Sequence, residues 1–156
     1  MKNNSTKFHM DLNNLFSDSA GAQIAGQYAA IITNSKYAKL FDFKMPDIRI
    51  KAMGLNHGMY DPLDRIKNKE AKKWNRSILN AFMKDYLGNE IHKYEKEMDF
   101  QSNITSSFPP SFVSCSVNDG LVGIQPVFLS KLESAGIHYI YKEYGHKDKA
   151  SDSTLT

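Results

Sequence analysis

Cysteine and tryptophan are scarce in this chain of 156 residues, which contains one of each. A single cysteine, Cys115, excludes an internal disulfide, and a reducing cytoplasm is therefore the expected location. No apolar run reaches the length that spans a membrane, and the first nine residues, MKNNSTKFH, lack the apolar segment of a signal peptide. We therefore expect a soluble protein without a targeting segment or a membrane anchor.

Motifs for binding nucleic acids are also missing. The net charge of +3 comes from scattered lysines, including the lysine-rich run at 67–73. Because no aromatic residues are interleaved with these lysines, the run is typical of a solvated helix face rather than of a nucleic-acid interface. The chain is 41% hydrophobic and 24% charged, as globular domains are. Length and composition predict a single domain over residues 1–156 with a real core.

A strand, a tight turn and a helix are predicted between residues 8 and 34. The turn at 17–21, with the sequence SDSAG, consists of small residues and has Ser19 at its apex. The helix that follows has its apolar residues at helical spacing and is expected to end at Asn34, and these residues are Ile24, Tyr28, Ile31 and Ile32. Two interpretations of the turn are open: Ser17 or Ser19 caps the helix, or the turn is a nucleophile elbow that presents a serine hydroxyl above a sheet.

Strands, loops and helices alternate through the rest of the chain. Strands are predicted at 48–55, 111–117 and 137–144, and helices at 70–87, 90–97 and from about 122 to a stop at Gly136. This order predicts an α/β fold with a mostly parallel sheet of about four strands and flanking helices. Ligands bind beyond the carboxyl ends of such strands. The polar residues 147–156 are expected to be disordered.

The segment SDSAGAQIAGQYAAI resembles the GDSAGAQIA segment of α/β-hydrolase esterases and lipases. The resemblance is specific around the elbow and continues, collinear but weaker, to the C-terminus. It implies a partial α/β-hydrolase fold that corresponds to the C-terminal half of such an enzyme. It also implies hydrolysis of a small-molecule ester without a metal or an organic cofactor, and a lid-like helical excursion at 62–100. Ser17 departs from the pattern, because it stands where the motif begins with glycine and could crowd the crossing of strand and helix.

The same resemblance implies a catalytic triad in the chain order serine, acid, histidine. Ser19 would be the nucleophile, Asp119 the acid that orients the base, and His146 the base. The backbone N–H of Ala20 would supply one donor of the oxyanion hole.

Other residues could take these roles, or none. Asp61 is the alternative carboxylate. His57 lies in a loop and His138 in a strand, and both are expected to be structural. His146 itself could be an exposed histidine without a catalytic role.

Two other functions stay open. The glycine-rich loop that supplies the second oxyanion donor in these hydrolases is missing, so the chain could be an inactive remnant or a split half completed by an N-terminal fragment. A sheet without its neighbouring strands exposes an edge, which predicts a marginal, oligomeric or partner-dependent protein. A flavodoxin-like binding domain is the other alternative, but SDSAGA lacks the glycine spacing and the lysine of phosphate-binding loops.

Overall fold

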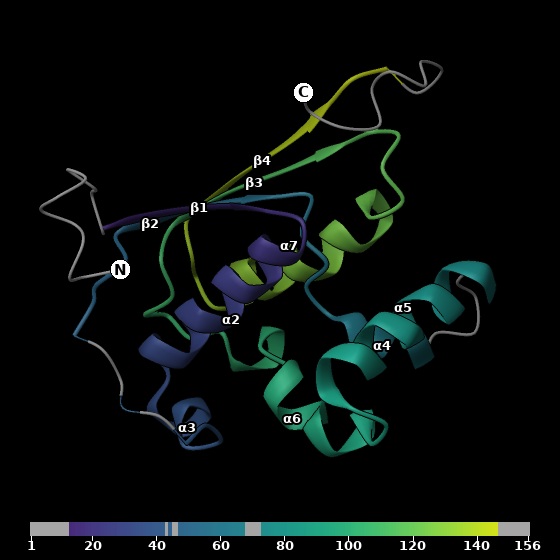
Figure 1. Ribbon diagram of the computed structural model, residues 1–156. Helices are drawn as coiled ribbons and strands as arrows, with labels where there is room; N and C mark the ends of the chain where they lie inside the picture. Colours follow the sequence, from purple (N-terminus) through teal and green to yellow (C-terminus); the bar gives the residue numbers. More distant parts are fainter. Residues whose placement is uncertain (1–12, 43, 45–46, 68–72, 147–156) are drawn as a thin grey trace, which may run out of the picture.

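A parallel sheet of four strands forms the centre of the computed structural model, which describes residues 13–42, 44, 47–67 and 73–146 (Figure 1). The strands lie across the sheet in the order of the sequence, as β1 (Asn14–Asp18), β2 (Ala52–Asn56), β3 (Ser111–Ser116) and β4 (Tyr139–Tyr144). Every neighbouring pair is parallel. The predicted α/β class and the four-stranded parallel sheet are therefore confirmed.

The helices lie on one side of the sheet (Figure 1). They are α2 (Ala20–Thr33), α3 (Ser35–Ala38), α4 (Pro62–Lys67), α5 (Lys73–Leu87), α6 (Glu95–Met98) and α7 (Gln125–Ser134), with 3-10 turns η2 (Ile91–Tyr94), η3 (Gln101–Asn103) and η4 (Val122–Ile124). Within the described ranges no helix covers the opposite face of the sheet. On that open face Phe16 and Ile140 are 72% and 55% exposed.

Helix α2 packs on the sheet through small residues. Ala22, Ala29 and Ala30 are fully buried, whereas Ile24, which shares the helical spacing of the apolar residues, is 54% exposed. A Cβ added at Gly26 would lie 2.8 Å from the Phe100 ring, which shows how closely the helix backbone approaches its neighbour. Small side chains allow this approach, and an apolar spacing rule that counts only large residues does not detect it.

Two apolar clusters hold the elements together. In the main core under the sheet, Tyr60 stacks on Phe128 with ring centroids 3.9 Å apart, and Phe100 meets Phe128 edge-on at 6.0 Å. A smaller cluster joins α4, α5, η2 and α6 through Leu63, Leu79, Met83, Ile91 and Met98. The described residues of the segment 62–100 thus pack partly on one another, and the lid-like role of this segment stays a prediction.

Several element boundaries differ from the predicted ones. Strand β2 begins at Ala52 rather than at residue 48, because its pairing with β1 starts there. Helix α4 was not predicted, and the predicted helix at 90–97 is a 3-10 turn followed by α6. The helix stops at Gly88 and Gly136 are confirmed, with φ of 82° and 70°.

Some predictions fall outside the described residues. These include residues 8–12 of the predicted segment 8–34, the start of the predicted helix at 70–72, and the tail at 147–156. No helix in the described part of the chain has the length and apolar character needed to cross a membrane. The cytoplasmic location stays a prediction.

Candidate active site

The polar residues singled out in the sequence gather at the carboxyl edge of the sheet. Ser19 follows β1, His57 follows β2, Asp119 follows β3 and His146 follows β4. Because all four strands are parallel, their carboxyl ends meet at one edge, where ligands bind in open α/β sheets. His138 precedes β4 and so lies at the opposite edge, away from this candidate site.

Ser19 is the whole turn between β1 and α2. Its φ of 52° and ψ of −124° form a conformation that L-residues rarely adopt, and that costs on the order of 1–3 kcal/mol. The backbone is held there by a 2.9 Å hydrogen bond from Ser19 N–H to the carbonyl oxygen of Asn56 on the neighbouring strand. The reversal is therefore sharper than predicted, because a single residue joins strand to helix.

The Ser19 hydroxyl does not cap the helix. Ser19 occupies the N-cap position of α2, yet it makes no side-chain capping hydrogen bond there. Its side chain is exposed and forms no hydrogen bond with any described residue. Of the two interpretations of the turn, the geometry fits the elbow rather than the cap, because the hydroxyl makes no hydrogen bond to the helix amides.

The neighbours of Ser19 leave room for the turn. A Cβ added at Gly21 would lie 3.7 Å from the Ser17 Cβ, an ordinary contact distance. The predicted crowding by Ser17 is therefore wrong at this position. The N–H of Ala20 lies at the first turn of α2 and donates to no backbone carbonyl in the described residues, as an oxyanion donor requires.

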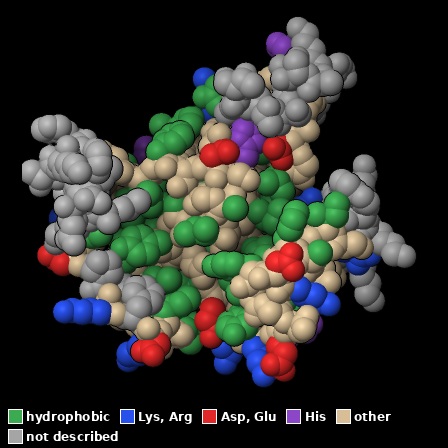
Figure 2. All heavy atoms as spheres, in the orientation of Figure 1, with side chains coloured by type: hydrophobic (Ala, Val, Ile, Leu, Met, Phe, Trp, Pro, Cys, Tyr) green, Lys and Arg blue, Asp and Glu red, His purple; other side chains and the backbone are tan. Residues whose placement is uncertain are grey.

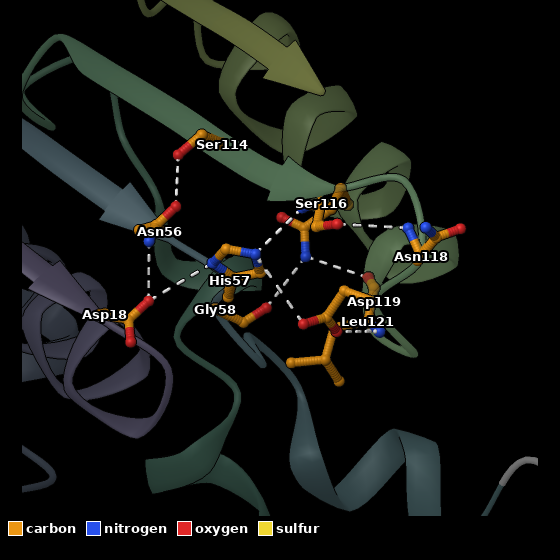
Figure 3. Close-up of polar contacts among 10 residues, drawn as sticks. Asp18, Asn56, His57, Gly58, Ser114, Ser116, Asn118, Asp119 and Leu121 are labelled. Atoms are coloured by element: carbon orange, nitrogen blue, oxygen red, sulfur yellow. Dashed lines mark hydrogen bonds and ion pairs between the residues drawn. The ribbon is translucent and has the colours of Figure 1, made fainter. Parts of the chain in front are cut away.

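Asp119 lies in the turn after β3, where its carboxylate is largely buried. Its Oδ1 accepts a 2.7 Å hydrogen bond from Leu121 N–H, which fixes the side chain. Its Oδ2 lies 3.9 Å from the Nε2 of His57 (Figure 3). The structure therefore brings Asp119 next to His57 rather than to His146.

His57 is buried, and both of its ring nitrogens have partners (Figure 3). Nε2 accepts a 3.0 Å hydrogen bond from the backbone N–H of Ser116, so this nitrogen carries no proton. The proton of the neutral ring is then on Nδ1, which lies 3.5 Å from Oδ1 of Asp18. An imidazole engaged in this way offers no lone pair to a serine hydroxyl.

His146 is exposed at the end of β4. Its carbonyl oxygen accepts a 2.8 Å hydrogen bond from Asn118 Nδ2, which ties it to the turn that carries Asp119. The Ser19 hydroxyl and the Asp119 carboxylate are not hydrogen-bonded to His146. The structure places the three residues at one edge without closing them into a hydrogen-bonded triad.

Asp61, the alternative acid, caps the N-terminus of α4. Its Oδ1 accepts a 2.8 Å hydrogen bond from Asp64 N–H, as in a helix cap. Burial raises the pKa of the Asp61 carboxyl above its ordinary value. This environment accounts for Asp61 without a catalytic role.

Among the residues that the structure describes, one set of side chains is close enough to hold a metal ion. Ligand atoms of His57, Cys115 and Asp119 all lie within 4.8 Å of one another. However, the Nε2 lone pair is directed at the Ser116 amide, and burial raises the pKa of the Cys115 thiol to about 12, which keeps it protonated. The arrangement is therefore not set up as a metal centre.

A cavity of about 200 Å³ lies next to the turn that carries Asp119. Its lining is largely apolar and consists of Met59, Arg65, Ile78, Leu79, Phe82, Gly120 and Leu121. Apolar side chains also gather on the same side of the molecule in the space-filling view (Figure 2). A second, larger cavity of about 710 Å³ lies beside the segments that lead into β2 and β3, at the edge away from Ser19.

Comparisons with solved structures identify the fold. Esterase B from Lactobacillus rhamnosis is similar with a TM-score of 0.75 and 16% identity, over 93% of this chain and 46% of that one. A carboxylesterase from Lactobacillus plantarum WCFS1 is similar with a TM-score of 0.65 and 15% identity, over 93% of this chain and 49% of that one. An acetyl ester-xyloside bifunctional hydrolase from Caldicellulosiruptor lactoaceticus gives a TM-score of 0.62 and 16% identity, over 93% and 51% of the two chains.

The predicted α/β-hydrolase fold is therefore confirmed, and its similar structures are esterases. The chain spans about half the length of the solved esterases it matches. No protein-family model and no curated protein matches the chain.

Proposed function

We propose that this chain is a serine hydrolase that cleaves a small carboxylic ester, with Ser19 as the nucleophile. The observation that carries the proposal is the backbone of Ser19, whose φ of 52° is strained and whose hydroxyl caps nothing. Strained backbone persists where the surrounding structure enforces it, and such residues concentrate at active sites. The esterases with the same fold support the reaction class.

The proposed reaction is acyl transfer to water. Ser19 Oγ bonds to the ester carbonyl carbon while its proton passes to His146, and the N–H of Ala20 stabilises the oxyanion. When the tetrahedral intermediate collapses, the carbon–oxygen bond of the ester breaks. The alcohol leaves with the proton that His146 accepted from Ser19. A water molecule then attacks the acyl-enzyme with His146 as base, which releases the acid and restores the Ser19 hydroxyl.

His146 is the proposed base because both ring nitrogens of His57 already have other partners. The lone pair of His57 Nε2 is used by Ser116, and its Nδ1 proton faces Asp18. Since Nε2 has no proton to donate, Oδ2 of Asp119 keeps its capacity to accept from another imidazole. Gly145, with φ of 94°, precedes His146 and gives the segment after β4 a backbone freedom that other residues lack.

The substrate would place its apolar group in the 200 Å³ cavity between α5 and the Asp119 turn. This volume suits a small ester better than a long-chain lipid. In this arrangement residues 62–100 would act as the lid-like excursion, because α5 supplies one wall of the cavity.

The test is covalent labelling with a fluorophosphonate probe, together with hydrolysis of p-nitrophenyl butyrate. We expect labelling of the wild type and none of Ser19→Ala, and a rate loss of at least about 100-fold in Asp119→Asn and His146→Ala. Equal labelling of wild type and Ser19→Ala would remove Ser19 from the mechanism. Full activity of His146→Ala would assign the base to another residue.

A second candidate is a hydrolase half that becomes active only with a complementary polypeptide. The open face of the sheet favours it, because Phe16 of β1 and Ile140 of β4 leave large apolar side chains in water. In the register of the sheet, Phe16, Gly54, Phe112 and Ile140 form one row across that face. A second polypeptide, or a second copy of the chain, would bury this row.

Size-exclusion chromatography with light scattering tests the second candidate. An oligomer, or a monomer whose ester hydrolysis appears only after a polypeptide partner is added, would support it. A monodisperse monomer that melts at high temperature and turns over ester alone would contradict it.

A further inference from the structure

His57 occupies a costly position that its role as a loop residue does not explain. Its φ of 47° lies in the left-handed region, and its side chain is only 8% exposed. A buried polar ring in a disfavoured backbone conformation persists only when specific partners hold it. Those partners come from both neighbouring strands.

On the side of β3, His57 contacts Ser116, where the turn that carries Asp119 begins. The 3.0 Å hydrogen bond from Ser116 N–H to Nε2 fixes the last residue of the strand. Ser116 in turn accepts two hydrogen bonds, from Asn118 N–H at its Oγ (3.3 Å) and from Asp119 N–H at its carbonyl oxygen (3.1 Å). Hydrogen bonds therefore connect His57, through Ser116, with the backbone of the turn that carries Asp119.

On the side of β1, residues 56 and 57 contact Asp18 and Ser19, at the turn that forms the elbow. Nδ1 of His57 faces Oδ1 of Asp18 at 3.5 Å, and this oxygen also accepts a 2.9 Å hydrogen bond from Asn56 Nδ2. The carbonyl oxygen of Asn56 accepts from Ser19 N–H at 2.9 Å. Residues 56 and 57 thus connect the turn that carries the nucleophile with the turn that carries the acid (Figure 3).

We infer that His57 is a positioning residue, which as a neutral imidazole holds the Asp119 turn in register with the Ser19 elbow. This inference rests on the proposed function. His57 does not touch the substrate and exchanges no proton with it. Replacement of His57 displaces the Asp119 carboxylate and hence the proposed base, His146. The replacement therefore lowers kcat and leaves the affinity for substrate largely unchanged.

Two substitutions separate this role from a merely structural one. In His57→Gln the amide oxygen reaches the place of Nε2 and can accept from Ser116 N–H, whereas the shorter side chain of His57→Asn reaches only the place of Nδ1. Asparagine, however, tolerates the left-handed backbone better than glutamine does. The glutamine variant therefore keeps the hydrogen bond to Ser116 but fits the backbone less well. The asparagine variant fits the backbone better but loses that hydrogen bond.

We expect kcat for p-nitrophenyl butyrate to fall about 10–100-fold in His57→Asn and less than about 10-fold in His57→Gln, with KM within about threefold of wild type in both. The melting temperature should rank the other way, with His57→Asn at least as stable as His57→Gln. If kcat follows the melting temperature, so that the asparagine variant is the more active one, the inference is overturned. A rise in KM without a loss of kcat would also overturn it.

Hydrogen exchange of the Ser116 amide gives a readout that does not depend on turnover. Exchange should be faster in His57→Asn and stay slow in His57→Gln. If wild type neither labels with the fluorophosphonate probe nor hydrolyses ester, the proposed function fails. The coupling of His57 to the acid turn then stands if Ser116 exchange differs between the two variants, and falls if it does not.

Discussion

Replacing Ser19 by glycine should stabilise the fold while abolishing hydrolysis. Ser19 has φ 52° and ψ −124°, where a Cβ collides with the backbone and glycine meets no such penalty. The strain of a non-glycine residue in this region is on the order of 1–3 kcal/mol. The hydroxyl makes no capping hydrogen bond, so its removal sacrifices no stabilising contact with the described residues.

The expected gain follows from two opposing contributions. Glycine relieves the strain but increases the conformational entropy of the unfolded chain, which costs about 0.4–1 kcal/mol. The free energy of unfolding should therefore rise by about 1 kcal/mol, which corresponds to about 2–4 °C in melting temperature for a chain of this size. Ser19→Ala is the matched control, because it removes the hydroxyl and keeps the Cβ that causes the strain.

Urea unfolding followed by circular dichroism measures the difference between the two variants. We expect Ser19→Gly to be more stable than both Ser19→Ala and wild type, with the slope against urea unchanged. A glycine variant that is less stable than the alanine variant would show that the turn is unstrained. The proposal that Ser19 is the nucleophile would then lose the strained backbone on which it rests.

Three further predictions concern the surroundings of the site. Gly26→Ala should lower the free energy of unfolding by about 1–2 kcal/mol because its Cβ would lie 2.8 Å from the buried Phe100 ring, whereas Gly21→Ala, with 3.7 Å to its nearest neighbour, should be close to neutral in urea unfolding. Cys115, whose thiol pKa burial raises to about 12, should resist iodoacetamide at pH 8 in the folded protein and react in urea, as mass spectrometry would detect, and rapid alkylation of the folded chain would contradict its burial. Burial raises the pKa of Asp61 above its unfolded value, so the ionised carboxylate destabilises the fold as pH rises through that window; Asp61→Asn should be more stable than wild type at pH 7 and lose this advantage as pH falls to the unfolded pKa, and an advantage that grows on acidification would contradict the assignment.

The sequence predicted the strand, the tight turn and the helix because their signal is local, whereas the resemblance of SDSAGAQIA to the hydrolase motif favoured the elbow over a helix cap. SDSAG combines small residues with a change from strand to helix, and the glycines at 88 and 136 mark helix ends by their freedom at positive φ. The parallel order of strands follows from the alternation of strand and helix. These features depend on neighbours in the chain, so one sequence is enough to predict them.

The features that the sequence did not predict depend on tertiary neighbours. Ile24 has helical spacing but faces solvent, because Gly26 and the alanines of α2 allow a closer contact with the sheet. The role proposed for His57 rests on its contact with Ser116, which is 59 residues away, and on a positive φ that no side-chain pattern indicates. The contact between His57 and Asp119 arises only when β2 and β3 become neighbours.

The sequential order of the strands has a consequence for how the chain assembles. Each strand pairs with the one synthesised just before it, so the sheet can grow in one direction during synthesis without waiting for a distant partner. The elbow and His57 follow β1 and β2, whereas His146, the histidine proposed as base, follows β4. In the proposed mechanism the nascent chain would therefore gain its base, and with it the ability to hydrolyse an ester, only when β4 joins the sheet.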